Sequence, residues 1–418
     1  MILKFNTIQR TTMFTKNFFF PLLTGFLLVS CATSKHRAEA ELTKEIDRIY
    51  NQGVFRGFSV AVVNEKGILY EKGFGFADEG MERHYTQNTI QNIASVSKTL
   101  VGIALLKAQE LGKLHLDDPV SEYLPFTVVN PSFPGTPITI RQLATHTSSI
   151  RDNEFYLSRN YYLKPHQQLK GTKLQFDDEQ VFNPADSIIS MRSFLEYTVS
   201  ENGKWNTGSF SEYSPGTLYE YSNVGTALAA LVLEEATGMP FNDFTKKHIL
   251  TPLKMKASGW KFSEVPFSQF SSLYEDADTP LPFYEMITYP DGGFISCTED
   301  LGRFLFELIK GYNGRGTLLS KESYKEYFTP QLSSSAFLDR NVHNPFSESF
   351  NVGIFVGFGY TGYIGHTGGD PGVLSMMFFN PATGIGRIMI FNTNFHDKKG
   401  NDAFYGIWNL LEKYEDRL

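Results

Sequence analysis

The chain has 418 residues, of which 41% are hydrophobic, 15% aromatic and 20% charged. This is the composition of a globular protein, and the length suffices for one large domain or two intertwined lobes. Lysine and arginine total 38 against 45 acidic residues, for a net charge of −7, and this balance excludes nucleic acid as the expected partner. Nine scattered histidines without metal-ligand spacing exclude a metal or other cofactor from our expectations.

The first thirty residues have the pattern of a signal peptide. Three basic residues and no acidic one accompany an apolar stretch from Phe18 to Val29, which is shorter than the ~20 residues of a membrane-spanning helix. Leu28-Val29-Ser30-Cys31 resembles a bacterial lipobox, in which cleavage before cysteine leaves a lipidated N-terminus. We therefore expect a lipoprotein signal peptide over residues 1–30, a lipid anchor at Cys31 and a tether over 31–40. The alternative is an ordinary signal peptide that contains a cysteine.

The predicted elements begin with a helix and two strands. Apolar residues recur on one face from Glu41 to Asn51, which predicts a helix. Valine-rich Phe58–Val63 and the following Ile68–Phe76 predict two strands joined by a turn. Helical spacing of apolar residues then predicts a helix over Ser97–Leu111.

The middle of the chain reads as mostly helical. From Arg151 to Trp205 the sequence is polar, aromatic and weakly periodic, which we interpret as part of an insertion over about 151–210. Helices are predicted at Gly225–Ala236 and Thr298–Lys310, and the second has acidic residues in its first turn.

The C-terminal part returns to strands. The predicted elements are the strands Val352–Tyr360, Val373–Asn380 and Gly386–Asn392 and the helix Asn401–Tyr414. The whole order predicts an α+β fold, in which an antiparallel β-sheet flanked by helices is built from both chain ends. A helical lobe is inserted over roughly 95–285, within one domain over 41–415.

Ser95-Val96-Ser97-Lys98 is the first motif with chemical meaning. A serine hydroxyl is a weak nucleophile that needs a base within hydrogen-bond reach, and a lysine three residues on lies on the same helical face. Burial near a helix N-terminus lowers the pKa of such a lysine, so that it can accept a proton. A second match, Ser258-Gly259-Trp260-Lys261, falls in a predicted loop or strand, and we interpret it as structural.

Two further motifs carry polar groups. In Tyr221-Ser222-Asn223 the tyrosine can serve as base and later as acid, and the asparagine can hold a substrate amide. His366-Thr367-Gly368-Gly369 lies between strand segments, where small residues on an edge strand form a backbone ledge for an extended substrate. An N–H of this ledge and the N–H of Ser95 are expected to form an oxyanion hole. Taken singly, each motif also fits a buried tyrosine or a tight turn.

Together, the three motifs in this order resemble the serine penicillin-recognising enzymes, especially the branch of class C β-lactamases and DD-peptidases. The stretches Leu143–Ile150, Pro252–Met255 and Gly292–Ser296 are similar to further landmarks of that family. The resemblance runs from about residue 42 to 415. It implies a β-lactamase/transpeptidase-like fold and catalysis without a cofactor.

The resemblance also implies a role for each matching residue. The proposed roles are the nucleophile Ser95, its proton acceptor Lys98, the second base Tyr221, the substrate-amide contact Asn223, the residues His366 and Thr367 for the substrate carboxylate or leaving side, and the ledge Gly368 and Gly369, with the N–H groups of Ser95 and Gly369 as the oxyanion hole. His146, in a matching stretch, is interpreted as packing behind the site. Buried Cys297 is expected to be structural as well.

The sequence departs from the β-lactamase pattern in two places. His366 stands where β-lactamases usually carry lysine, and a mostly uncharged histidine attracts a carboxylate less strongly, which favours peptidases and esterases. The interval of 126 residues from Ser95 to Tyr221 is longer than the family pattern, with the extra length near the insertion.

We expect a serine hydrolase that forms an acyl-enzyme on amide or ester carbonyls, such as those of D-amino-acid peptides or β-lactams. A carboxylesterase of the same family and a non-catalytic envelope binding or sensor protein are the alternatives. The expected partners are a small-molecule or peptide substrate, with peptidoglycan as one candidate, and a bacterial envelope membrane to which the exported protein is anchored by lipid.

Overall fold

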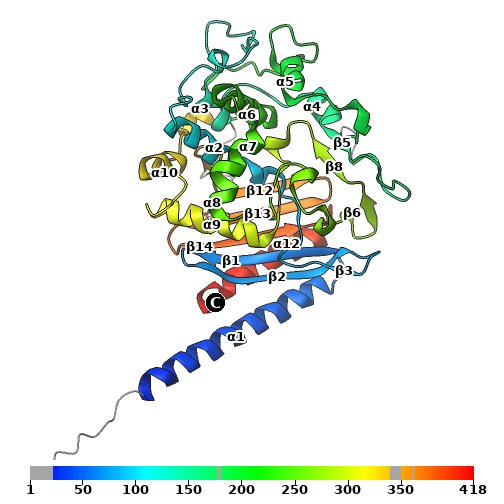
Figure 1. Ribbon diagram of the computed structural model, residues 1–418, viewed down its shortest axis with the longest axis vertical. Helices are drawn as coiled ribbons and strands as arrows, with labels where there is room; N and C mark the ends of the chain where they lie inside the picture. Colours follow the sequence, from blue (N-terminus) through cyan, green and yellow to red (C-terminus); the bar gives the residue numbers. More distant parts are fainter. Residues whose placement is uncertain (1–21, 177–179, 339–349, 360–361) are drawn as a thin grey trace, which may run out of the picture.

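The computed structural model describes residues 22–176, 180–338, 350–359 and 362–418, with side chains from Ser34 onward (Figure 1). Most of the predicted signal peptide therefore lies outside the described residues, and the side chain of Cys31 lies outside them too. Within the described part of the chain, no helix is long and apolar enough to cross a membrane.

An antiparallel sheet of eight strands forms the centre of the molecule, in the order β10-β11-β12-β13-β14-β1-β2-β3. The strands are β1 (Gly57–Asn64), β2 (Gly67–Asp78), β3 (Arg83–His84), β10 (Asn351–Val352), β11 (Gly357–Phe358), β12 (Ile364–Asp370), β13 (Val373–Asn380) and β14 (Ile385–Phe391). Strand β1 pairs with β14, with Val60 opposite Met389. The sheet is thus built from both chain ends, and this confirms the predicted fold class.

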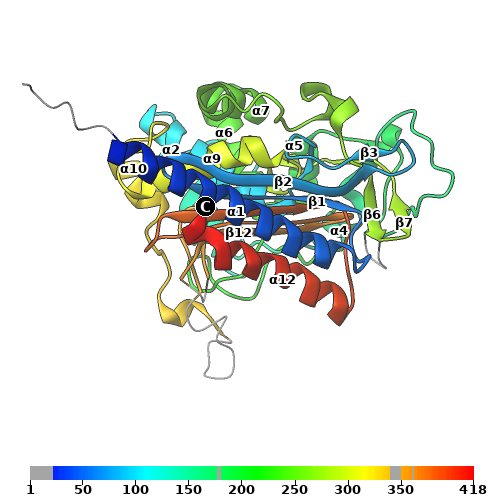
Figure 2. The same cartoon turned by 90° about the horizontal axis from the view of Figure 1, so that it is seen from below.

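Helices cover both faces of this sheet. On one face lie α1 (Leu22–Tyr50) and α12 (Lys398–Tyr414), which run side by side in Figure 2. On the other face lie α2 (Lys98–Glu110), α6 (Asn223–Thr237) and α9 (Thr298–Tyr312). Because side chains alternate along a strand, Val60 and Val62 pack towards α1 and α12, whereas Ala61 and Val63 join the core on the other face.

The remaining shorter elements lie mostly in the helical lobe. They are α3 (Ile140–Ala144), α4 (Glu154–Arg159), α5 (Met191–Val199), α7 (Phe241–Thr245), α8 (Thr251–Leu253) and α10 (Lys321–Tyr327), with the small strands β4 (Gln91–Asn92), β5 (Tyr161–Leu163), β6 (Leu273–Asp276), β7 (Thr279–Leu281), β8 (Tyr284–Met286) and β9 (Ile295–Ser296). The segment 151–210 supplies α4, β5 and α5, and β5 pairs with β8. This pairing ties the segment to the rest of the lobe.

Two local predictions differ from the structure. Residues 31–40, expected to be a tether, continue helix α1, because Ala38, Leu42 and Ile46 recur every four residues and are fully buried in the core shared with α12. The prediction of a single strand over Val352–Tyr360 is wrong. The N–H of Gly353 instead bonds the carbonyl of Val356 at 2.8 Å, and this turn separates β10 from β11; Tyr360 lies outside the described residues.

Candidate active site

Ser95 lies in a tight turn at the start of helix α2. A single 3₁₀ turn over Ala94–Ser97 (η1) leads directly into α2, whose first residue is Lys98. Ala94 has a φ of +49°, a conformation that residues other than glycine seldom adopt. The Ser97 hydroxyl donates to the Ala94 carbonyl at 2.6 Å and accepts from the Phe294 N–H at 3.2 Å, and these bonds hold the turn.

Lys98 is fully buried directly beside Ser95. Its Nζ lies 3.0 Å from Ser95 Oγ, 2.7 Å from Asn223 Oδ1 and 2.6 Å from the Asp291 carbonyl oxygen. Burial lowers the pKa of Lys98 from its ordinary value, and the nearby carboxylates oppose this shift. The amine form, which can take a proton from Ser95, is therefore accessible nearer to neutral pH than for an exposed lysine.

Asp152 fixes the orientation of Asn223, which contacts Lys98 in this cluster. Its carboxylate accepts hydrogen bonds from the N–H groups of Asn223 (3.1 Å) and Val224 (2.9 Å) at the start of α6, and from Asn223 Nδ2 at 2.8 Å. The Asn223 amide is thereby oriented with its oxygen towards Lys98. Sequence reasoning missed Asp152; its one signal is its position just after the stretch 143–150 that matches the family.

Tyr221 stands over Lys98, one residue before the cap of α6. Its ring centroid lies 4.9 Å from Lys98 Nζ, and its hydroxyl interacts with Ser95. Burial raises the pKa of Tyr221 above its ordinary value, and the hydrogen bond with Ser95 opposes the rise. Because 37% of Tyr221 remains exposed, solvent limits this shift. The pKa nevertheless stays above its ordinary value, so Tyr221 keeps its proton in the resting site.

Strand β12 forms the opposite wall with the motif His366-Thr367-Gly368-Gly369. Its pairing with β11 ends at Gly365, whereas β13 accompanies it to Asp370, so among the described residues the motif borders the cleft as an edge. A Cβ on Gly368 would lie 2.5 Å from the Ile93 carbonyl oxygen and 3.0 Å from Ala94 Cβ. The absence of a side chain at Gly368 thus lets the serine turn pack directly against the strand.

His366 is uncharged near neutral pH. Burial lowers its pKa to about 4, and the positive charge of Lys98 adds to the effect. Its Nδ1 lies 2.5 Å from the Thr367 carbonyl oxygen, and its ring centroid lies 6.2 Å from that of Tyr221. The structure thus brings together all of the residues expected at the site: Ser95, Lys98, Tyr221, Asn223, His366, Thr367, Gly368 and Gly369.

Two further carboxyl groups border the cluster and were not expected from the sequence. Asp370, at the end of β12, accepts a hydrogen bond of 2.6 Å from the Tyr161 hydroxyl, and burial raises its pKa to about 6. Buried Asp291 accepts from Thr288 Oγ1 at 2.6 Å and from the Tyr156 hydroxyl at 3.3 Å. Both tyrosines come from the segment 151–210, which therefore supports the site directly.

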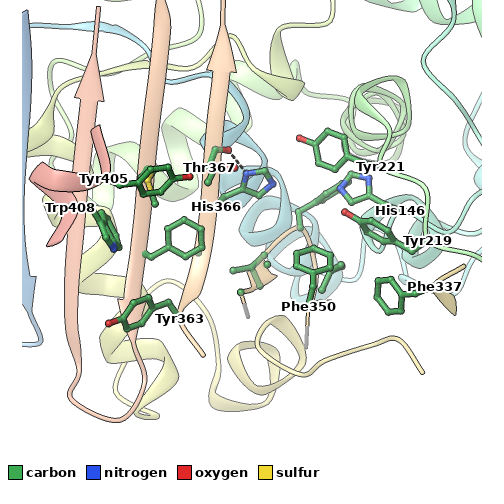
Figure 3. Close-up of a pocket in the computed structure, with 18 of the residues that line it drawn as sticks. His146, Tyr219, Tyr221, Phe337, Phe350, Tyr363, His366, Thr367, Tyr405 and Trp408 are labelled. Carbon is green, nitrogen blue, oxygen red and sulfur yellow. Dashed lines mark hydrogen bonds between the residues drawn. The ribbon is translucent and has the colours of Figure 1, made fainter. Parts of the chain in front are cut away.

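A cavity of about 1410 Å³ begins at Tyr221, His366 and Thr367 and runs along the outer edge of β12 to helix α12. Figure 3 shows Tyr405 and Trp408 at one end, His366 near the middle, and Tyr221 and His146 towards the other end. Aromatic side chains make up much of the lining, which contains no lysine or arginine among the described residues. The space extends away from Ser95 and suits a long ligand without negative charge.

The other candidate groups have structural surroundings. Ser258 donates to Asp300 at 2.9 Å, and Lys261, the lysine of the same motif, faces the ring of Tyr289. Cys297 is 1% exposed, and burial raises the pKa of its thiol to about 12. Within the described part of the chain, no cluster of three metal-binding side chains occurs.

The sheet built from both chain ends, with the serine turn between the helical lobe and the β12 edge, defines the β-lactamase/transpeptidase-like fold. The model of the Beta-lactamase family matches residues 40–412, and the chain belongs to this family. The putative penicillin-binding protein PbpX of Bacillus subtilis (strain 168) is 29% identical over 333 residues, which are 76% of this chain and 71% of that protein.

Solved structures agree on the fold. The octameric penicillin-binding protein homologue from Pyrococcus abyssi superposes with a TM-score of 0.67 at 22% identity, over 92% of this chain and 79% of that one. The D-amino acid amidase of Ochrobactrum anthropi SV3, in complex with L-phenylalanine amide, gives a TM-score of 0.65 at 19% identity, over 92% and 98%. At these identities the likeness establishes the fold, and the reaction has to be argued from the site.

Proposed function

We propose that the protein is a serine hydrolase that forms an acyl-enzyme on Ser95 from amide or ester substrates. The observation that carries this proposal is the 3.0 Å contact between Lys98 Nζ and Ser95 Oγ at a buried lysine of lowered pKa. A buried amine at this distance is the base that a serine nucleophile needs. Membership of the Beta-lactamase family supports the same reaction class.

The proposed reaction has two halves. The amine of Lys98 takes the proton of Ser95 as Oγ attacks the carbonyl carbon, and the N–H groups of Ser95 and Gly369 stabilise the oxyanion. The intermediate collapses when Tyr221 gives its proton to the leaving amine or alcohol. In the second half, the Tyr221 phenolate takes a proton from water, which attacks the acyl-enzyme. Lys98 then returns its proton to the released Ser95 Oγ.

The charge of the site bears on the substrate. Lys98 is surrounded by the carboxyl groups of Asp152, Asp291 and Asp370, and His366 is neutral. A substrate carboxylate would meet little compensating positive charge here. We therefore place neutral or cationic acyl donors, such as D-amino-acid amides and esters, ahead of β-lactams.

The test is intact-protein mass spectrometry after incubation with a fluorophosphonate and, separately, with benzylpenicillin. The native protein is expected to gain one fluorophosphonate adduct, and Ser95→Ala to gain none. Ser258→Ala removes the serine of the second motif and serves as the matched control, which should label like the native protein. Labelling that persists in Ser95→Ala would refute the proposal. A penicillin adduct that is never released would instead favour the sensor alternative.

We also propose that Cys31 carries a lipid that tethers the exported protein to an envelope membrane. The support is the sequence pattern that precedes Cys31, and the part of helix α1 after Cys31 leads into the domain. Metabolic labelling with an alkynyl fatty acid in a bacterial host should mark the native precursor and not Cys31→Ser. Equal labelling of both would contradict the anchor.

A further inference from the structure

His146 lies behind Tyr221 in the loop that follows α3. It is 4% exposed, and its ring lies against the ring of Tyr221 with centroids 4.5 Å apart and planes 32° apart. Figure 3 shows the two rings facing each other at the inner end of the cavity. The ring of Phe355 lies edge-on to the imidazole, with centroids 5.4 Å apart. His146 is therefore a wall of the pocket in which the Tyr221 ring rests.

Hydrogen bonds connect His146 to the backbone on both sides of Tyr221. Its carbonyl oxygen accepts from the N–H of Glu220 at 2.8 Å, and its Nδ1 accepts from the N–H of Ser222 at 3.2 Å. A single residue thus accepts hydrogen bonds from the N–H groups of the residues before and after Tyr221. His146 has a φ of +55°, an uncommon conformation for a residue with a side chain.

The contact with Ser222 fixes the protonation state of the imidazole. Because Nδ1 accepts a backbone hydrogen bond, the ring is neutral and carries its proton on Nε2. Burial favours this form, and the charge of nearby Lys98 favours it further. A phenylalanine would fill the same space but would leave the Ser222 N–H buried without an acceptor.

We propose that His146 is a positioning residue that holds the Tyr221 hydroxyl in place beside Ser95, through its Nδ1 bond to Ser222 and its ring contact with Tyr221. This goes beyond packing, because it requires a hydrogen-bond acceptor at Nδ1. It rests on the proposed function, in which Tyr221 transfers the proton. A displacement of such a group by about 1 Å slows the reaction on the order of 100-fold.

The test compares His146→Phe and His146→Asn by their hydrolysis of p-nitrophenyl butyrate. His146→Phe keeps a ring and loses the acceptor, so kcat is expected to fall 10- to 100-fold while KM stays within about twofold. His146→Asn places an oxygen near the position of Nδ1 and tolerates a positive φ. The decrease in log kcat for His146→Asn should therefore be at most half of the decrease for His146→Phe. His248→Phe is the control, since the His248 ring lies tilted against Phe244, with centroids 4.5 Å apart, outside the site.

A double-mutant cycle identifies Tyr221 as the target. In a Tyr221→Phe background, His146→Phe should cause less than a twofold further loss of kcat, because the group that His146 positions is gone. An equal loss in both backgrounds, or no recovery in His146→Asn, would overturn the inference. If the native protein leaves the ester intact, or if Tyr221→Phe alone has no effect, the proposed function itself fails, and the inference falls with it.

Discussion

Gly368 offers a direct test of how the serine turn is positioned. A Cβ at this position would lie 2.4 Å from Ser375 Oγ, 2.5 Å from the Ile93 carbonyl oxygen and 3.0 Å from Ala94 Cβ. Ile93 and Ala94 immediately precede Ser95, and the Ser375 hydroxyl already donates to the Ile93 carbonyl at 2.6 Å. The substitution Gly368→Ala therefore has to push the turn that carries Ser95 away from β12.

The size of the effect follows from these distances. Ordinary van der Waals contacts begin near 3.5 Å, so the turn has to move by about 1 Å. Overpacking of this kind costs about 1–3 kcal/mol in the free energy of unfolding. A displacement of about 1 Å between nucleophile and oxyanion hole slows the reaction on the order of 100-fold, which corresponds to about 2.7 kcal/mol in the barrier.

The assay is the rate constant for labelling by a fluorophosphonate, measured beside urea unfolding. The control for stability is Gly369→Ala, because the atom nearest to its added Cβ is Leu374 Cδ2 at 3.9 Å. Gly369→Ala is expected to unfold within about 0.5 kcal/mol of the native protein. If Gly368→Ala labels Ser95 at the native rate, direct packing of the turn on β12 does not position the nucleophile.

Three further predictions concern charge. Because burial lowers the pKa of Lys98, a greater fraction is the neutral amine as the pH rises, so labelling of Ser95 should climb through the neutral range and level off well below pH 10.5. His366→Lys adds a positive charge at the rim, and acylation by anionic benzylpenicillin should rise about tenfold relative to a neutral ester, measured by stopped-flow mass spectrometry; an unchanged ratio would contradict this electrostatic account. Arg387 is 1% exposed, lies against the rings of Tyr363 and Trp408, and pairs with Glu415 at 3.1 Å. Because Arg387→Met leaves the Glu415 carboxylate without its partner, it should lower the free energy of unfolding in urea by about 3 kcal/mol. A loss below about 1 kcal/mol would argue against a stabilising ion pair.

The sheet and the long helices were predictable because their signals are local. Strand β13 was predicted from its run of apolar residues, and its side chains alternate between buried and partly buried from Val373 to Asn380. Helix α6 begins after the Ser222 cap and ends at Gly238 with a φ of +67°, and both signals are visible in the sequence. The helix over residues 31–40 was not predicted, because this segment has few apolar residues. Its Ala38 is buried only because α12 packs nearby.

The site was predictable in part for the same reason. Ser95 and Lys98 are one helical turn apart, so their contact follows from spacing alone. Asp152 and Asp370 acquire their roles from partners about 70 and 209 residues away, namely Asn223 and Tyr161. No periodicity or short motif in the sequence indicates contacts between residues so far apart in the chain, and only folding brings these groups together.

The charge of the site bears on which of the candidate substrates it favours. Burial raises the pKa values of Asp152, Asp291 and Asp370, to about 8 for Asp291 and about 6 for Asp370, so the absence of positive charge matters more here than repulsion. Three carboxyl groups surround Lys98, burial keeps His366 neutral, and the cavity that begins at Tyr221 has no lysine or arginine among its described lining residues. A substrate with a free carboxylate near the scissile bond gains little at such a site, whereas a neutral ester or an amine-bearing amide has no need of a positive partner there. The electrostatics therefore support the proposal that amides and esters are preferred to β-lactams.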